Sequence, residues 1–173
     1  MRSNRALYSE KVMVWVGILN DTIIGPYYFE ENVNSDSYQE FLTDFVLPEL
    51  ARLGYDSHEI CYQHDGAPAH TTAEVRQCLT ENFGSWIGRG AGADISWPSR
   101  SPDLNPLDFF LWGHVKSKVF QNEPNTLDNM KQRINLVLTN ITPEMLSNVF
   151  RNFTKRLDLC IVKNGGHFEH FMS

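Results

Sequence analysis

Apolar residues along the chain follow two spacings, and each spacing predicts a different kind of element. Residues 11–19 are rich in β-branched and aromatic side chains, and Asn20-Asp21 follows them as a turn. Residues 23–29 have the composition of a returning strand. Pro26 inside this second run favours an edge or bulged position. The pattern therefore predicts an antiparallel hairpin.

Helical spacing begins after the hairpin. Ser35 or Asp36 caps a predicted helix that reaches Leu50, and Pro48 predicts a kink or a split inside it. A capping box at residues 71–74 opens a second helix. The apolar face of this second helix comprises Val75, Cys78, Leu79 and Phe83.

The remaining elements alternate short strands with longer helices. Strands are predicted at residues 59–63 and 95–97, with a Gly-rich loop at 84–92 between them. Three further helices are predicted at residues 106–120, from about 127 to 137, and from the Thr142-Pro143 cap to the glycines near 165. This order of elements predicts an α/β fold with a mixed sheet.

Composition and charge narrow the classes of protein. The 173 residues suffice for one domain. They contain no apolar run of eighteen, which argues against a membrane span, and the first ten residues lack the apolar core of a secretory signal. Three widely spaced cysteines indicate reduced thiols. The net charge of −6 argues against holding nucleic acid by bulk electrostatics, so a DNA-related role must rest on a local site.

Asp65 is the first candidate for chemistry. It ends the strand predicted at residues 59–63, where α/β folds place ligand sites, and His64 and His70 flank it. An Asx turn, in which the side chain bonds its own backbone, explains the same residue structurally. The local sequence leaves both interpretations open.

Asp108 is the second candidate. Asn105 as N-cap, Pro106 at the first position and Asp108 at the third form a capping box, which favours a structural role on local grounds. Asp65 and Asp108 together suit a hard divalent cation, which takes few carboxylates and keeps waters for a phosphate. A two-metal site usually needs a third carboxylate as well.

Several long motifs occur in a diagnostic order. "YQHDGAPAH" followed by "WPSRSPDLNPLDFFLWGHVK" resembles the second and third signature blocks of the mariner superfamily of DDE/D transposases. The opening "KVMVWVGILNDTIIGPYYFEENVN" and the tail "RLDLCIVKNGGHFEH" are similar to the flanking segments of that family. The resemblance covers nearly the whole chain.

The resemblance implies a ribonuclease H-like mixed sheet flanked by helices, with its first strand missing and a helical C-terminal extension. Residues 1–122 would form the catalytic core, and residues 123–173 the extension. The strand ending near Gln63 is then expected beside the hairpin.

The resemblance also implies a function. Asp65 matches the second catalytic Asp and Asp108 the third, with Mg²⁺ or Mn²⁺ as cofactor, whereas Asp103 belongs to the turn. The implied activity is metal-dependent DNA strand cleavage and transfer at transposon ends. The family's first Asp lies before the segment at residues 12–19, so the 173-residue chain alone is expected neither to nick nor to join DNA.

The implied partners are transposon ends and target DNA, with a homodimer in the full-length parent, no membrane, and a nuclear location. Five residues are candidates for DNA contacts: His64, His70, Arg100, Lys116 and Lys118.

Three alternatives remain. The chain could be a catalytically inactive remnant that binds only nucleic acid or protein. It could be a single-metal hydrolase that uses His64, Asp65 and His70. A metal site at His167 and His170 is a weaker hypothesis than a docked or frayed end.

Overall fold

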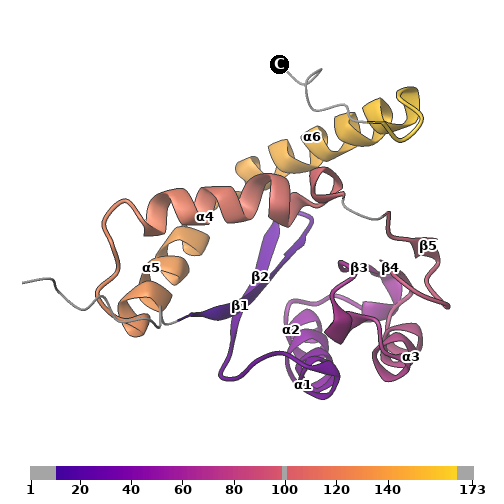
Figure 1. Cartoon of the computed structure of the whole chain (residues 1–173), viewed down its shortest axis with the longest axis horizontal. Coiled ribbons are helices and arrows are strands. Elements are labelled where there is room, and N and C mark those ends of the chain that lie inside the picture. Colours follow the sequence, from indigo (N-terminus) through magenta and orange to yellow (C-terminus); the bar gives the residue numbers. More distant parts are fainter. Residues whose placement is uncertain (1–10, 99–100, 167–173) are drawn as a thin grey trace, which may run out of the picture. The chain divides into compact units, whose positions relative to one another are not determined.

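The computed structural model describes residues 11–98 and 101–166. The chain forms two compact units (Figure 1). The first unit comprises the residues up to Glu30 together with those from Ser101 onward, and the second unit comprises Glu31–Arg100. Among the described residues, no helix combines the length and apolarity that crossing a membrane requires.

The first unit begins with the predicted hairpin. Strands β1 (Met13–Leu19) and β2 (Thr22–Phe29) pair antiparallel, with a register irregularity between Trp15 and Gly17. Gly25, opposite this irregularity, has a φ of 94°, a left-handed conformation that favours glycine. The predicted hairpin and the predicted bulged position beside Pro26 are both confirmed.

Three helices of the first unit follow in the second half of the chain. A π-helical segment, Leu107–Leu111, runs directly into α4 (Trp112–Val119). Helices α5 (Leu127–Thr139) and α6 (Pro143–Val162) come next. Thr142 caps α6 by accepting a hydrogen bond from the amide of Met145 at 3.2 Å, as the cap-plus-proline pattern predicted.

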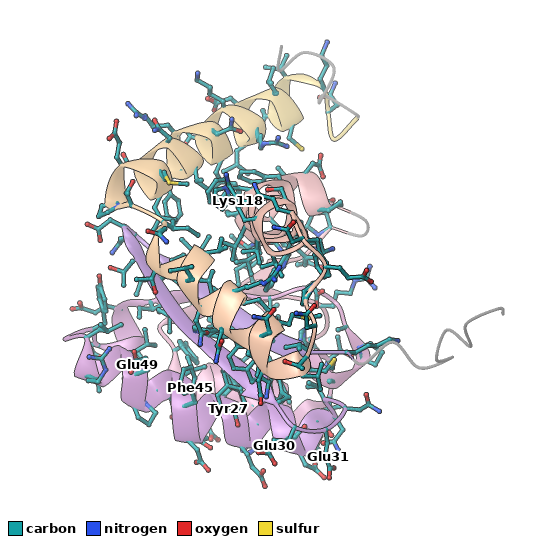
Figure 2. All side chains as sticks on the ribbon, turned by 90° about the vertical axis from the view of Figure 1, so that its left-hand side faces the viewer. Tyr27, Glu30, Glu31, Phe45, Glu49 and Lys118 are labelled. Carbon is teal, nitrogen blue, oxygen red and sulfur yellow. The ribbon has the colours of Figure 1, made fainter. Side chains whose placement is uncertain are left out.

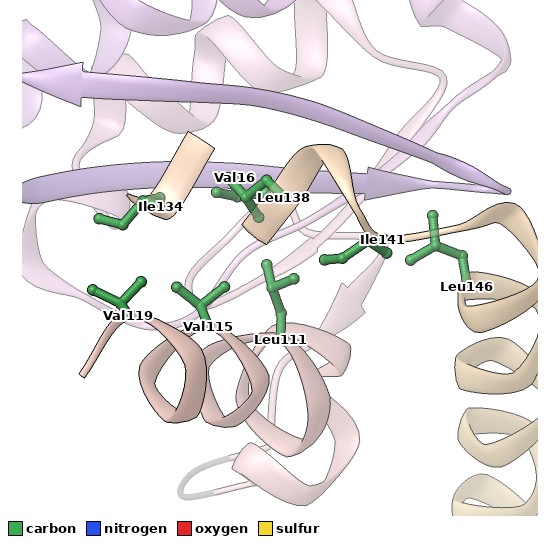
Figure 3. Close-up of a cluster of buried hydrophobic side chains, with 8 residues drawn as sticks. All are labelled: Val16, Leu111, Val115, Val119, Ile134, Leu138, Ile141 and Leu146. Carbon is green, nitrogen blue, oxygen red and sulfur yellow. The ribbon is translucent and has the colours of Figure 1, made fainter. Parts of the chain in front are cut away.

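One apolar cluster joins the hairpin to these helices (Figure 3). Val16 of β1 supplies the sheet side, and Leu111, Val115 and Val119 form a row with four-residue spacing on the facing helix. Ile134, Leu138, Ile141 and Leu146 complete the cluster from α5, α6 and the turn between them. The boundary predicted after residue 122 therefore falls inside this unit.

The second unit begins with a long helical stretch. Helix α1 (Ser35–Phe41) continues through a π-helical segment, Leu42–Val46, into α2 (Leu47–Arg52). Asn34 is the N-cap, in place of the predicted Ser35 or Asp36, and its side chain accepts from the amide of Ser37 at 2.9 Å. Pro48 lies at the start of α2, directly after the π-helical segment, so the helix departs from regular α geometry next to the predicted place.

A small parallel sheet forms the rest of the second unit. Strands β3 (Cys61–Gln63), β4 (Ser85–Gly88) and β5 (Ile95–Ser96) lie in that order, and β3 and β4 are connected through α3 (Ala73–Asn82). Short 3₁₀ turns occur at Ser57–Glu59 and Pro68–His70 here, and at Pro102–Leu104 in the first unit.

Three further sequence predictions need correction. Residues 84–92 are not all loop, because β4 lies there and buries Trp86 to 1% exposure beside β3. In the described structure β3 pairs with β4 and not with the hairpin. Helix α3 is capped by Thr72, one residue later than predicted, because the side chain of Thr72 accepts from the amide of Val75.

Candidate functional site

Asp65 lies at the carboxyl end of β3, in the loop before the 3₁₀ turn Pro68–His70. Its Oδ1 accepts a hydrogen bond from the amide of Ala67 at 3.0 Å and another contact from Nδ1 of His70 at 2.8 Å. The Asx turn and the histidine contact are thus both present. The side chain is nevertheless 56% exposed, so the carboxylate is open to solvent.

The electrostatics of this loop keep Asp65 ionised. The hydrogen bond from His70 is the largest cause that lowers the pKa of Asp65, to about 2, and the amide of Ala67 adds to it. A carboxylate only accepts hydrogen bonds, so Nδ1 of His70 carries the proton that lies between them. Asp65 therefore presents a full negative charge at any neutral pH.

His64 has a different environment, although its ring stacks on that of His70. The two ring centroids are 5.1 Å apart with planes only 7° from parallel. His64 is 7% exposed, and Tyr38 Oη lies 3.4 Å from its Nδ1. Burial, together with the neighbouring His70, lowers the pKa of His64 from its ordinary 6.5 to about 4. This burial argues against the predicted DNA contact by His64.

Gly88, at the end of β4, lies next to the Nε2 edge of the His64 ring. A Cβ placed on Gly88 would lie 2.5 Å from Nε2 of His64 and 2.9 Å from the Trp86 ring. Nε2 has no hydrogen-bond partner among the described residues. His64, Asp65 and His70 do not form a metal-binding group, and the described residues hold no group of three or more potential ligands. The described residues therefore lend the single-metal hydrolase hypothesis no support, and zinc uptake by the chain stays its test.

Asp108 belongs to the first unit and lies in the first turn of the π-helical segment that precedes α4. The amide nitrogen Nδ2 of Asn105 donates to its Oδ2 at 2.9 Å, while Oδ1 of Asn105 accepts from the amide of Leu107 at 3.0 Å. Asn105 thus satisfies the amide of Leu107 at the helix start, but it bonds the side chain of Asp108 directly and does not form the predicted capping box, since the segment itself has Pro106 at the N-cap position. Asp108 is exposed, and its approach to Asp65 stays a prediction.

Asp103, the competing carboxylate, lies in the 3₁₀ turn Pro102–Leu104 and is partly buried. Its carbonyl oxygen accepts from Nη1 of Arg156 at 3.0 Å. The guanidinium of Arg156 also lies over the ring of Phe109, 4.3 Å from its centroid. These contacts join the turn to α6 and support the structural role expected for Asp103.

The basic candidates divide between the two units. Lys116 and Lys118 are exposed in the last turn of α4, and Figure 2 marks Lys118 on that helix. Arg100 and the histidines at positions 167 and 170 lie outside the described residues.

Arg89 is a further candidate that sequence reasoning missed. It directly follows β4, is exposed, and lays its side chain against Gly66, the residue after Asp65. A Cβ on Gly66 would collide with the Cδ of Arg89, so any other residue there would displace this flexible side chain. No local signal marks Arg89, because its position beside Asp65 arises only when β4 pairs with β3.

Comparison with known proteins identifies the relatives of this chain. Residues 4–131 match the family of DDE superfamily endonucleases. The Tc1 transposable element transposase of Caenorhabditis elegans is 25% identical over 154 residues, which are 89% of this chain and 52% of the relative. The Tcb1 transposase of Caenorhabditis briggsae is 30% identical over 110 residues, 62% of this chain and 36% of the relative. The chain thus spans about half the length, or less, of these relatives.

Solved structures agree on the fold. The catalytic domain of Mos1 mariner transposase has a TM-score of 0.77 at 22% identity, covering 91% of this chain and 76% of that chain. A Mos1 paired end complex with Mn has a TM-score of 0.80 at 23% identity, covering 98% and 48%. The expected ribonuclease H-like α/β class is confirmed. The chain therefore belongs to the DDE superfamily of endonucleases.

Proposed function

We propose that this chain supplies two of the metal-binding carboxylates of a DNA transposase that cleaves and joins strands at transposon ends. The observation that carries the proposal is the state of Asp65, which is ionised, exposed and held at the carboxyl end of β3. Asp108, exposed and oriented by Asn105, is the second carboxylate.

The donor set fits a hard divalent cation. Both hydrogen bonds that Asp65 accepts from the described residues end on Oδ1, which leaves Oδ2 for another ligand. Carboxylate oxygens are the ligands that Mg²⁺ and Mn²⁺ prefer. Mos1 catalytic-domain structures are described with Mn and with Mg, which supports the same ions here. Bound ions of this kind supply an activated attacking oxygen and a stabilised leaving oxygen.

The chain's own residues would position the ions and the DNA backbone. Asp65 and Asp108 provide fixed negative charge, and phosphoryl transfer depends mainly on such positioning and charge. Arg89 beside the Asp65 loop and the lysines of α4 are the candidates for phosphate contacts, which orient DNA without reading its sequence. A Mos1 complex with a transposon end supports DNA as the partner.

A nicking assay tests this proposal. The chain is extended upstream to include the first carboxylate that the resemblance implies, and it is given supercoiled DNA with Mn²⁺ or Mg²⁺. We expect nicking that falls on the order of 10²-fold or more in Asp65→Ala and in Asp108→Ala. Asp103→Ala is the matched control and should retain nicking, because its contact to α6 is made by the backbone carbonyl.

Two results would contradict the proposal. Nicking that survives both carboxylate substitutions would show that the metal site lies elsewhere. An extended chain that binds DNA but shows no metal-dependent nicking would favour the non-catalytic remnant.

A further inference from the structure

The carboxylate of Asp65 is held in one orientation by two donors on the same oxygen. The amide of Ala67 fixes Oδ1 from within the loop, and Nδ1 of His70 fixes it from the following turn at 2.8 Å. A single donor would leave the carboxylate free to rotate about the remaining bonds. Two donors from different directions restrict it, and they direct hydrogen bonding to Oδ1 alone.

The turn that carries His70 is itself well defined. Pro68 begins the 3₁₀ turn, where its fixed φ suits the first position, and the amide of His70 donates to the carbonyl of Ala67 at 2.9 Å. Ala67 therefore contacts Asp65 through its N–H and His70 through its C=O. The backbone of His70 is thereby coupled to the loop that holds Asp65.

The ring of His70 is fixed by aromatic neighbours. It lies 4.1 Å from the ring centroid of Tyr38 at 31°, in addition to its stacking on His64. Tyr38 is 1% exposed, and its hydroxyl lies 3.0 Å from that of Tyr62. Because Tyr38 and His64 are buried, they hold the imidazole in the plane that directs Nδ1 toward Asp65.

We propose that His70 is a positioning residue for metal binding, which holds Asp65 by Oδ1 so that Oδ2 is presented to a divalent cation. This inference rests on the proposed function. Outer partners of metal ligands typically contribute about 10–100-fold to metal affinity by orienting the ligand. In this role the N–H at Nδ1 of His70 donates the hydrogen bond to Asp65, and the packing of the aromatic ring fixes the direction of that N–H.

Two substitutions separate the donor from the ring. His70→Phe keeps an aromatic ring for Tyr38 and His64 but has no N–H to donate. His70→Asn loses the ring but places an amide N–H near the position of Nδ1. The probe is Mn²⁺ alone, titrated into the 173-residue chain and followed by the electron paramagnetic resonance of the free ion.

We expect Mn²⁺ affinity to follow the donor. His70→Phe should bind about tenfold more weakly than the wild type, and His70→Asn should recover most of that loss. The matched control is His114→Phe, because His114 also stacks on an aromatic ring, that of Phe110, at 5.7 Å. It should leave Mn²⁺ affinity unchanged. Circular dichroism of each variant confirms that the fold is retained.

The outcomes distinguish this inference from the proposed function. If Asp65→Ala loses Mn²⁺ but His70→Phe binds as the wild type does, the role of His70 is overturned and the proposed function stands. If the wild type binds Mn²⁺ and Asp65→Ala binds it equally tightly, Asp65 is not a metal ligand, so the proposed function and the inference fail together.

A spectroscopic test needs no metal. Long-range ¹H–¹⁵N correlation at pH 8 reports which ring nitrogen of His70 carries the proton. The geometry requires the Nδ1–H tautomer in the wild type and its loss in Asp65→Ala. The Nε2–H tautomer in the wild type would overturn the inference.

Discussion

His64 and His70 stack on each other, yet only His70 is placed to serve Asp65. His64 lies against Tyr38 and Gly88 in the interior, whereas His70 contacts a solvent-exposed carboxylate. The sequence showed two imidazoles near an acid and made both DNA-contact candidates. It could not separate them, because Tyr38 and Gly88 come from distant segments.

The buried His64 predicts acid sensitivity. Its folded pKa of about 4 lies below the ordinary value of 6.5, so the neutral ring stabilises the fold fully above pH 6.5. This stabilisation is lost as the pH falls from 6.5 toward 4, by up to about 3 kcal/mol. Urea unfolding at pH 7.5 and pH 4 measures it. His64→Gln should show a smaller fall in unfolding free energy, and an equal fall would contradict the assignment.

The carboxylate of Asp65 predicts that stability also depends on pH, in a more acidic range than that of His64. Its folded pKa of about 2 lies below the ordinary 3.8, so its stabilising contribution is complete above about pH 4 and disappears as the pH falls toward 2. Carbon-detected NMR of the carboxyl group follows this titration. In His70→Phe the pKa should rise toward its ordinary value, because the largest cause of the depression is removed. An unchanged pKa would show that the amide of Ala67 suffices.

At the scale of elements, hydrophobic spacing predicted the hairpin and the helices well, because each carries its own period and caps. Strand β4 was missed because glycines at positions 84, 88, 90 and 92 resemble a loop. Its strand character comes from pairing with β3 and from the buried ring of Trp86. The glycine at 88 reflects close approach to His64, not a turn.

Two glycines make a matched pair that tests this explanation. Gly88→Ala should destabilise the fold by about 1–3 kcal/mol, because the added methyl meets the buried rings of His64 and Trp86. Gly113→Ala in α4 should stabilise it by about 0.5–1 kcal/mol, because nothing lies within 4 Å of the new methyl and alanine favours the helix. Urea denaturation of both variants measures the difference. Equal effects would refute the close approach at Gly88.

For the whole molecule, the net charge of −6 means that the proposed DNA affinity would have to come from a few local cations. The sequence predicts this need but does not locate all of the cations that could meet it. Lysines in a predicted helix were visible as candidates, whereas Arg89 becomes one only through its contact with Gly66. The two carboxylates could be named because the family motifs contain them.

DNA binding measured against salt concentration tests these cations. Each phosphate contact contributes about 0.9 to the slope of log affinity against log salt. Arg89→Gln should therefore reduce the slope by about 1 and weaken binding to all duplex sequences alike. Arg52→Gln is the control, because Arg52 forms an ion pair with Glu49 at 2.7 Å. A reduction of the slope in Arg52→Gln, or none in Arg89→Gln, would contradict the assignment.

In the π-helical segment Leu107–Leu111, the number of residues matters as well as their identity, because it sets how far Asp108 is rotated around the helix axis relative to α4. A π turn is an α-helix with one residue inserted, and one residue corresponds to about 100° of rotation. Deleting a single residue after Asp108 in this segment would leave Val115 and Val119 in the core, but it would turn Asp108 by about 100° around the helix axis. The direction of this carboxylate is therefore set by an insertion, which a helical wheel drawn on the sequence does not register.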